Sequence, residues 1–357
     1  MSAIDEPGSV RSGEQIDEQA LRLHLASKLE QFDDTQALTI QQFPGGHSNL
    51  TYLIKQGDSE YILRRPPIGS QVKTAHDMSR EYRVLSKLGP VYSKAPTPLY
   101  LCEDESVLGS HFYLVQRMRG FIVRKDFPDT MTTTPELRRG MCNSLLTTLS
   151  ELHSFDYEKI GLGQLGRPQG YTERQVQGWT RRYHDAKTDD IDAVESVGRW
   201  LSDNLPPELE STLIHNDFKF DNLVLDPENP TAVVGILDWE MATLGDPLMD
   251  LGTALSYWVQ ANDPPTLHAF RFAPTHLEGM MSRAEVAAAY GQASGRSMEH
   301  ILFYYVFGLF KSVGIVQQIY YRYKQGLTLD PRFGQFIHAV RALSGHAMAT
   351  ISDGEIS

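Results

Sequence analysis

The chain has 357 residues, of which 41% are hydrophobic and 22% charged, and its formal net charge at pH 7 is −12. This composition excludes a mostly disordered chain, and the length favours two lobes over one hydrophobic core. The acidic balance, without a cluster of Lys and Arg, argues against a nucleic-acid partner. We therefore expect a folded, enzyme-sized protein that meets any anionic ligand with a metal ion, backbone N–H groups and a few basic side chains.

Cysteine usage and apolar runs predict a cytoplasmic protein without a membrane partner. The two cysteines, Cys102 and Cys142, are isolated, so neither a disulfide framework nor a structural zinc site is indicated. Residues 1–14 are polar and include acidic residues, which predicts a disordered tail and no signal peptide. The longest apolar stretch ends before Lys311, well short of the ~20 residues that a membrane span requires.

The N-terminal part alternates short β-rich runs with turn residues, and it contains two helical patterns. The predicted strands are residues 37–43, 50–55, 60–65, 98–103 and 111–116, the first three as an antiparallel meander, and the predicted helices are residues 14–30 and 75–88. Asp77 is a capping residue near the start of the second helix. These elements predict an N-terminal lobe over residues 15–119.

After Gly120 the periodicity becomes helical almost throughout. The predicted helices are residues 134–154, 176–187, 190–204, 250–257, 283–294, 298–323 and 333–350. The aromatic residues of helix 298–323 predict a core helix, with a substrate-pocket wall as the alternative. Residues 120–357 are therefore predicted to form a helical C-terminal lobe, and the chain as a whole has an α+β fold with two lobes.

The chemistry is concentrated between Leu213 and Gly252. Residues 223–225 and 232–237 predict two strands of a hairpin, because turn residues separate them. A hairpin brings its open ends together, so Asn222 and Asp238 should converge, with Asp217 five residues upstream of Asn222. Two carboxylates and an amide oxygen are hard ligands that suit Mg²⁺ and do not suit zinc.

The run His215-Asn-Asp-Phe-Lys-Phe-Asp-Asn222 matches the pattern HxDxxxxN. In this it resembles protein kinases and the aminoglycoside phosphotransferase/choline kinase superfamily. Asp238-Trp239-Glu240 is more like the small-molecule branch than the Asp-Phe-Gly of protein kinases. The run LGDPLMDLG that follows closely resembles the kinase-like domain fused to some acyl-CoA dehydrogenases, and free-standing bacterial relatives of that branch. The resemblance implies a protein-kinase-like fold with a small antiparallel strand lobe and a larger helical lobe.

The resemblance also implies an activity, namely transfer of the γ-phosphate of ATP, with Mg²⁺, to a hydroxyl of a small molecule. Asp217 would be the catalytic residue that accepts or orients the hydroxyl, and Lys219 would meet the transferred phosphate. Asn222 and Asp238 would hold the metal. The remaining members of the motif are expected to be architectural: His215 within the loop, and Asp246 and Asp250 as acceptors for backbone N–H groups of the loop.

The strand lobe would bind the nucleotide. The turn after the first strand would cover the phosphates with Gly45, Gly46, His47, Ser48 and Asn49. Arg64 stands where the resemblance places a Lys, and Glu81 would be its ion-pair partner; Arg65 adjoins it, and strand alternation puts the two arginines on opposite faces. The segment from Gln116 through Met118 to Gly120 would be the hinge whose backbone bonds adenine.

Two other classes compete with this interpretation. The Arg-for-Lys change at Arg64 allows a catalytically silent nucleotide-binding or regulatory module, against which the intact Asp217, Asn222 and Asp238 count. A hydrolase with paired carboxylates would act without nucleotide and would not need the glycine turn or Glu81. The acceptor is left open among hydroxyacyl compounds, aminoglycosides, amino alcohols and sugars, with the hydroxyacyl class favoured by the resemblance; the oligomeric state is also left open.

Overall fold

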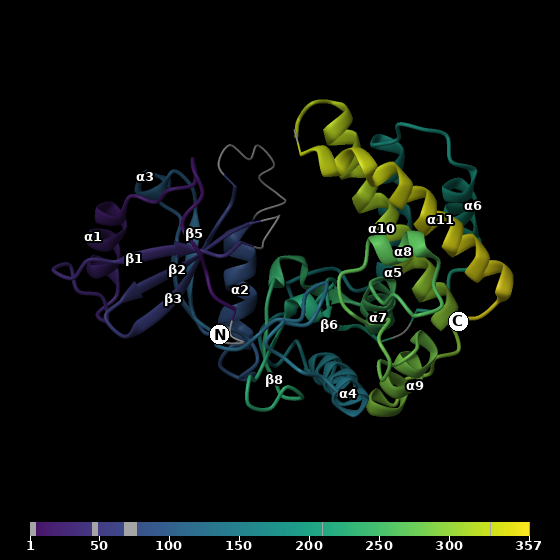
Figure 1. The fold of residues 1–357 in the computed structure, drawn as a ribbon, viewed down its shortest axis with the longest axis horizontal. Helices are drawn as coiled ribbons and strands as arrows, with labels where there is room; N and C mark the ends of the chain where they lie inside the picture. The colour runs from purple at the N-terminus through teal and green to yellow at the C-terminus, as the bar shows by residue number, and fades with distance from the viewer. Residues whose placement is uncertain (1–4, 45–48, 68–76, 209, 329, 357) are drawn as a thin grey trace. The chain divides into compact units, whose positions relative to one another are not determined.

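The computed structural model describes residues 5–44, 49–67, 77–208, 210–328 and 330–356. The chain divides into a strand-rich unit, residues 1–122, 223–229 and 233–242, and a helical unit, residues 123–222, 230–232 and 243–357 (Figure 1). The predicted α+β class with two lobes is confirmed. The predicted limits 15–119 and 120–357 stay a prediction.

An antiparallel sheet forms the centre of the strand-rich unit (Figure 1). In the order β1-β2-β3-β5-β4, its strands are β1 (Thr39–Gln42), β2 (Leu50–Gln56), β3 (Ser59–Arg65), β5 (Phe112–Gln116) and β4 (Pro98–Cys102). Tyr52 of β2 pairs with Leu63 of β3, and Leu63 pairs with Leu114 of β5. All five predicted strands are confirmed, with ends that differ by at most two residues.

Helices complete the core of this unit. In α1 (Glu18–Lys28), Leu21 and Leu25 are fully buried in the same cluster as Tyr52 and Leu63. The other long helix is α2 (Met78–Leu88), and α3 (Glu105–Leu108) is a single turn. Asp77 caps α2, as predicted, by accepting a hydrogen bond from Arg80 N at 2.9 Å. The apolar side of α2 is buried, and Glu81 is buried with it.

The N-terminal segment was predicted to be a disordered tail. Residues 5–14, the part of this segment that the structure describes, differ from that prediction. Gly8 and Gln42 exchange two backbone hydrogen bonds of 2.9 Å. Gln42 lies in β1, an edge strand whose outer backbone groups would otherwise be unpaired. The prediction failed because pairing to a sheet edge depends on backbone groups, and the polar composition of the segment carries no signal of it.

The predicted hairpin is confirmed as β7 (Leu223–Leu225) and β8 (Val233–Ile236). It lies within residues 120–357, yet it packs in the strand-rich unit. Phe121 and Leu225 exchange two backbone hydrogen bonds of 2.9 Å, and Ile236 N donates to Lys94 O at 2.7 Å. The short 3₁₀ turn η2 (Trp239–Met241) follows β8. The hairpin thus fixes the Asp-Trp-Glu segment to the strand-rich unit.

The helical unit is built around a long central helix, α10 (Ile301–Lys324), which packs against α5, α6, α7 and α11 (Figure 1). The helices are α4 (Pro135–Leu152), α5 (Tyr171–Asp185), α6 (Asp192–Asp203), α7 (Pro247–Ser256), α8 (Pro265–Ala269), α9 (Arg283–Ser294), α10 and α11 (Phe336–Asp353). The shorter elements are β6 (Thr212–Ile214), paired with β9 (Thr243–Gly245), and the 3₁₀ turns η1 (Phe220–Asn222) and η3 (Pro331–Gln335). The seven predicted helices are confirmed.

Two of these helices begin earlier than predicted. Helix α5 starts at Tyr171, after the left-handed Gly170. The prediction missed this first turn because the turn is polar and lacks the apolar spacing on which the prediction relied. Helix α7 starts at Pro247, where Asp246 caps it. Asp followed by Pro is a common helix start, because the side chain accepts an orphan N–H and proline has none to lose.

Helix α10 is the core element that the aromatic pattern predicted. Tyr304, Tyr305, Phe307 and Phe310 are buried. Within the described residues, α10 has a length and hydropathy that would allow a membrane span, yet 67% of its most apolar window is buried inside the protein. It crosses α7 at a glycine contact, where a Cβ on Gly252 would lie 2.1 Å from Tyr304 O. This close crossing brings residues of α7 and α10 to the same loop.

Candidate active site

The loop after β6 carries the HxDxxxxN motif and has a left-handed residue, Asn216, with φ 66°. Asp250 of α7, which is fully buried, accepts hydrogen bonds from His215 N at 2.6 Å and Asn216 N at 2.8 Å. His153 lies 3.2 Å from the same carboxylate. Burial raises the pKa of Asp250, but these partners outweigh it and hold the pKa below its ordinary value. The predicted bracing of the loop by Asp250 is confirmed.

Asp246 has a different role from the one predicted. Its carboxylate accepts from Leu248 N at 2.8 Å and from Tyr304 Oη at 2.6 Å. It therefore caps α7 and ties that helix to α10. The prediction grouped Asp246 with Asp250, but the two lie one helical turn apart, and it is Asp250 whose carboxylate bonds the loop.

A buried lysine on α10 holds the loop from the other side. Lys311 Nζ donates to Asn216 O at 2.6 Å and lies 3.5 Å from Thr253 Oγ1. Burial lowers the pKa of Lys311 to about 8, although Asp217 and Asp250 act against this; Lys219 and Arg182 lower it further. Sequence reasoning missed this residue, treating it as the end of an apolar stretch. The available signal was a single cation within the mostly apolar residues 301–316 of that helix.

Lys311→Met should change how stability depends on pH. Between about pH 8 and the ordinary lysine pKa near 10.5, Lys311 is protonated more fully in the unfolded chain than in the folded one, so its contribution to wild-type stability rises with pH across this window. The variant has no such group. We expect the free energy of unfolding of the wild type, relative to the variant, to increase from pH 8 to 10, measured by urea unfolding. A difference that stays constant or falls with pH would contradict this placement of Lys311.

Asp217 is held by three side chains of the helical unit. Its Oδ2 accepts from Lys219 Nζ at 2.8 Å and from Asn222 Nδ2 at 2.9 Å, and its Oδ1 accepts from Tyr257 Oη at 2.8 Å. Burial raises the pKa of the Asp217 carboxyl, but Lys219 and the Tyr257 hydrogen bond outweigh it and lower the pKa. An ionised, oriented carboxylate results. Tyr257 was not predicted, because it lies forty positions along the chain from Asp217.

Asn222 ends η1 and is oriented by the loop. Its Nδ2 donates to Asp217 O at 2.8 Å as well as to the carboxylate. Because the amide nitrogen makes both bonds, the oxygen Oδ1 is the atom that could ligate a cation. His215 is fully buried, and its Nδ1 accepts from Asp217 N at 3.3 Å, which agrees with the predicted architectural role.

The strand-rich unit carries the other predicted residues. Arg64 of β3 donates from Nη1 to Glu81 Oε1 at 2.6 Å, and its Nη2 lies 2.7 Å from Asp238 Oδ1. Burial lowers the pKa of Arg64, but Glu81, Tyr113 and Asp238 outweigh it and raise the pKa well above the ordinary value. Within the described residues, Arg64 Nε has no hydrogen-bond partner although it is buried. The guanidinium is thus charged, and its Nε–H group can still donate a hydrogen bond.

Arg65 points away from this cluster. It donates to Tyr52 Oη at 3.2 Å, Leu108 O at 3.3 Å and Glu14 O at 3.2 Å. The predicted alternation of the two arginines is therefore confirmed. Arg64 is the one that contacts the predicted site residues Glu81 and Asp238, and which of the two arginines meets the phosphates stays a prediction.

The Asp-Trp-Glu segment is anchored at its centre. Trp239 is buried; its backbone N donates to Glu81 Oε1 at 3.1 Å and its indole Nε1 to Ile236 O at 2.8 Å. Asp238 has φ 62°, and its side chain is 41% exposed. Glu240 accepts from Asn49 Nδ2 at 2.6 Å. Sequence reasoning assigned no role to Glu240, although its place in the triplet was a signal; it links the segment to the end of the glycine turn.

The other residues predicted to bind the nucleotide belong to the glycine turn and to the segment from Gln116 to Met118. Gly45, Gly46, His47 and Ser48 lie outside the described residues. Gln116 is exposed at the end of β5, and its N–H donates to Thr97 O at 2.9 Å. Met118 is partly buried, with its sulfur close to Gly235. The hinge role of Gln116 and Met118 stays a prediction.

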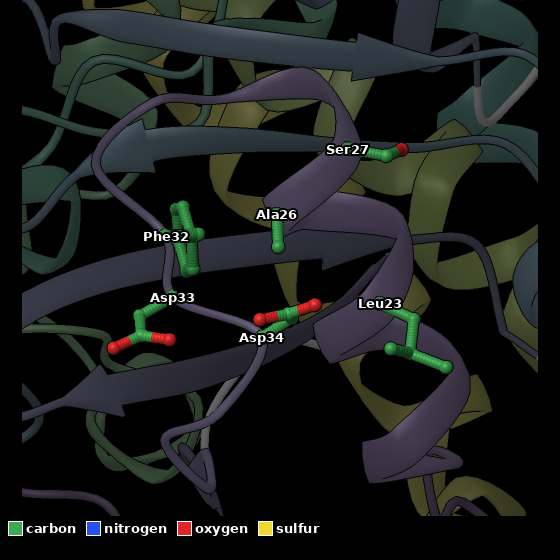
Figure 2. Close-up of a pocket in the computed structure, with 6 residues that line it drawn as sticks. All are labelled: Leu23, Ala26, Ser27, Phe32, Asp33 and Asp34. Carbon is green, nitrogen blue, oxygen red and sulfur yellow. The ribbon is translucent and has the colours of Figure 1, made fainter.

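A hollow also opens beside the C-terminal half of α1. Figure 2 shows its lining by two carboxylates and the side chains around them, namely Leu23, Ala26, Ser27, Phe32, Asp33 and Asp34. It contains none of the predicted site residues. Asp33 is engaged locally, accepting from Thr35 Oγ1 at 2.6 Å.

The predicted metal ligands are hard oxygen donors. Asp238 offers a carboxylate that is partly exposed, and Asn222 offers an oriented amide oxygen. Such ligands fit Mg²⁺ shared with phosphates, whereas zinc sites use Cys and His. Across the part of the chain that the structure describes, no group of three or more His, Cys, Asp or Glu could hold a metal. Asn222 belongs to the helical unit and Asp238 to the strand-rich unit, so their joint role as metal ligands stays a prediction.

A strand-rich unit with a buried Arg–Glu pair and a helical unit with a braced HxDxxxxN loop define a kinase-like phosphotransferase. Residues 39–290 match the family described as "Phosphotransferase enzyme family", and the chain belongs to that family. It is 34% identical over 352 residues to acyl-CoA dehydrogenase family member 11 of Gallus gallus, covering 95% of this chain and 44% of that protein. It is likewise 34% identical to family member 10 of Mus musculus, over 88% of this chain and 29% of that protein. The chain spans less than half the length of these relatives.

Solved structures share the fold. A protein of Ralstonia eutropha described as an aminoglycoside phosphotransferase has a TM-score of 0.80 and 28% identity, covering 95% of this chain and 99% of that one. Choline kinase of Cryptosporidium parvum has a TM-score of 0.61 and 10% identity, covering 94% of this chain and 96% of that one. The second likeness concerns the fold alone.

Proposed function

We propose that the protein transfers the γ-phosphate of ATP, with Mg²⁺, to a hydroxyl of a small molecule. The observation that carries the proposal is the Asp217 carboxylate, ionised by its surroundings and held in place through both oxygens by Tyr257, Lys219 and Asn222. A fixed carboxylate can accept a hydrogen bond from a hydroxyl and aim its oxygen for in-line attack. Membership of the phosphotransferase family supports the reaction class.

Asp217 would act mainly by orientation. Its lowered pKa makes it a weak base, so it would take the hydroxyl proton only late in the reaction. This suits phosphoryl transfer, whose loose transition state asks for positioning and charge stabilisation more than for an early proton transfer. Lys219 Nζ, 2.8 Å from the carboxylate, would offset charge on the transferred group.

The nucleotide would be met by the strand-rich unit. Arg64, which is charged and contacts Glu81 through Nη1 and Asp238 through Nη2, would also donate hydrogen bonds to phosphate oxygens. Asn222 and Asp238 would hold the magnesium ion. When bound, that ion would neutralise phosphate charge and fix the phosphate orientation.

The acceptor class is a proposal from the relatives. The region similar to this chain is part of larger proteins that are named acyl-CoA dehydrogenase family members. Their name favours a hydroxyacyl compound as the acceptor over aminoglycosides, amino alcohols and sugars. We also propose a cytoplasmic location, with neither nucleic acid nor a membrane as partner.

An acceptor screen tests the function. The purified chain would be incubated with ATP and Mg²⁺ and with hydroxyacyl thioesters, aminoglycosides, amino alcohols or sugars, and ADP release measured. We expect release that depends on one acceptor class and that stops when EDTA removes the metal. Magnesium-dependent ATP binding without turnover on any acceptor would instead favour the silent module.

Arg64→Gln should weaken Mg-ATP binding by about tenfold to a hundredfold, because a charge-assisted contact to phosphate is lost. The adjacent Arg65→Gln is the matched control, since Arg65 faces the other side of the sheet. We expect it to lower the melting temperature while leaving affinity unchanged, measured by calorimetric titration. Equal losses of affinity in both variants would argue against a direct role for Arg64.

A further inference from the structure

Two aromatic rings lie beside Lys219, which pairs with the predicted catalytic carboxylate of Asp217. Tyr257 follows the end of α7, and Phe272 lies in the segment after α8. Their ring centroids are 5.2 Å apart, with the planes at 75°. Phe272 is 48% exposed, whereas its neighbour Ala273 is buried. We call Tyr257 and Phe272 the ring pair.

Lys219 reaches into the ring pair. Its ammonium lies 4.9 Å from the Tyr257 centroid and 5.4 Å from the Phe272 centroid. Both distances fall within the ~6 Å over which a cation is attracted to a ring face. The same ammonium forms the 2.8 Å ion pair with Asp217. One cation of the chain therefore engages both rings and the carboxylate at once.

Without the lysine, these three groups would make a cation site. Aromatic faces with a nearby carboxylate are how proteins recognise quaternary ammonium compounds. An amino alcohol carrying such a group could place its cation on the rings and its hydroxyl near Asp217. In this chain the Lys219 ammonium already lies against the two rings and the carboxylate. A cationic acceptor would therefore be repelled by the charge of Lys219.

We propose that Lys219 is a specificity-determining residue that excludes cationic acceptors, so that the hydroxyl substrate is neutral or anionic. The inference rests on the proposed function and narrows its acceptor class. The exposed part of the Phe272 side chain would then offer an apolar surface to the carbon skeleton of the acceptor. Lys219 would at the same time favour a negative group on the acceptor, as well as the transferred phosphate.

Binding of tetramethylammonium and choline to the full chain, without nucleotide, tests the proposal by ligand-observed NMR. The wild type and Lys219→Arg should show no binding at millimolar ligand. Lys219→Ala should gain binding by at least about tenfold, because removal of the internal cation frees both rings. Adding Phe272→Leu to Lys219→Ala should remove most of that gain. Lys219→Ser provides a second opening variant if the alanine variant does not fold, as judged by circular dichroism.

Either of two results would overturn the proposal: wild-type protein that binds these cations as tightly as Lys219→Ala, or folded Lys219→Ala and Lys219→Ser that gain nothing. Because no nucleotide or turnover enters the measurement, failure of the proposed phosphotransfer would leave the cation result unchanged. Conversely, phosphorylation of choline by the wild type would sustain the proposed function and refute the role of Lys219.

Discussion

Asp217→Asn should lower the rate of phosphoryl transfer by roughly a thousandfold while leaving Mg-ATP affinity unchanged. Asparagine keeps the size of the side chain and can still contact Tyr257 and Lys219, but it replaces one acceptor oxygen with a donor and removes the charge. The attacking hydroxyl then loses its hydrogen-bond acceptor. Steady-state kinetics with the preferred acceptor would measure the loss, and calorimetric titration the affinity.

Asp221→Asn is the matched control, because Asp221 lies in the same loop but pairs with Arg124 at 2.9 Å. We expect its rate to stay near that of the wild type. An Asp217→Asn variant with wild-type turnover would refute the assignment of Asp217. Equal losses in both variants would show that the loop is sensitive to any change of charge, and would remove the evidence for a specific role.

Asp250→Ala should cost about 3–5 kcal/mol in the free energy of unfolding and abolish most of the activity. The substitution leaves two buried backbone N–H groups, those of His215 and Asn216, without their acceptor, and His153 without its carboxylate. The left-handed conformation of Asn216 then loses one of the contacts that maintain it. Urea unfolding and kcat measure the two effects.

Asp246→Asn is the control that distinguishes loss of the hydrogen bonds to the loop from a general destabilisation of α7. Asp246 caps the same helix and bonds Leu248 N and Tyr304 Oη, neither of which belongs to the loop. Asparagine caps a helix about as well as aspartate, so we expect a loss of only about 1 kcal/mol in stability, from the weaker hydrogen bond to Tyr304, with kcat retained. If Asp250→Ala is too unstable to purify, Asp250→Asn at low temperature replaces it. A stable and fully active Asp250→Asn would contradict the account.

Local sequence signals predicted most of the fold. The strands β1 to β5 follow β-rich runs between turn residues, and the hairpin β7–β8 follows from two short runs around a turn. The pairing of Arg64 with Glu81 and the bracing by Asp250 followed from resemblance to a motif. Asp246 was assigned wrongly, although its Asp-Pro start could have predicted a helix cap.

The residues that were missed are distant in the chain and belong to no local motif. Tyr257 and Phe272 reach Asp217 and Lys219 from beyond the catalytic segment, and Lys311 reaches Asn216 across 95 positions. Their positions depend on the crossing of α7 and α10 at Gly252, which periodicity alone does not specify. Packing of the helical unit, and not the motif, therefore determines the surroundings of the carboxylate.

The fate of an isotopic label on the γ-phosphate of ATP tests the central claim most directly. With Mg²⁺ and the acceptor found by the screen, we expect the label in a phosphate ester of the acceptor, formed in step with ADP. Label found only in inorganic phosphate, or retained in ATP while the protein binds it, would contradict a phosphotransferase built around Asp217.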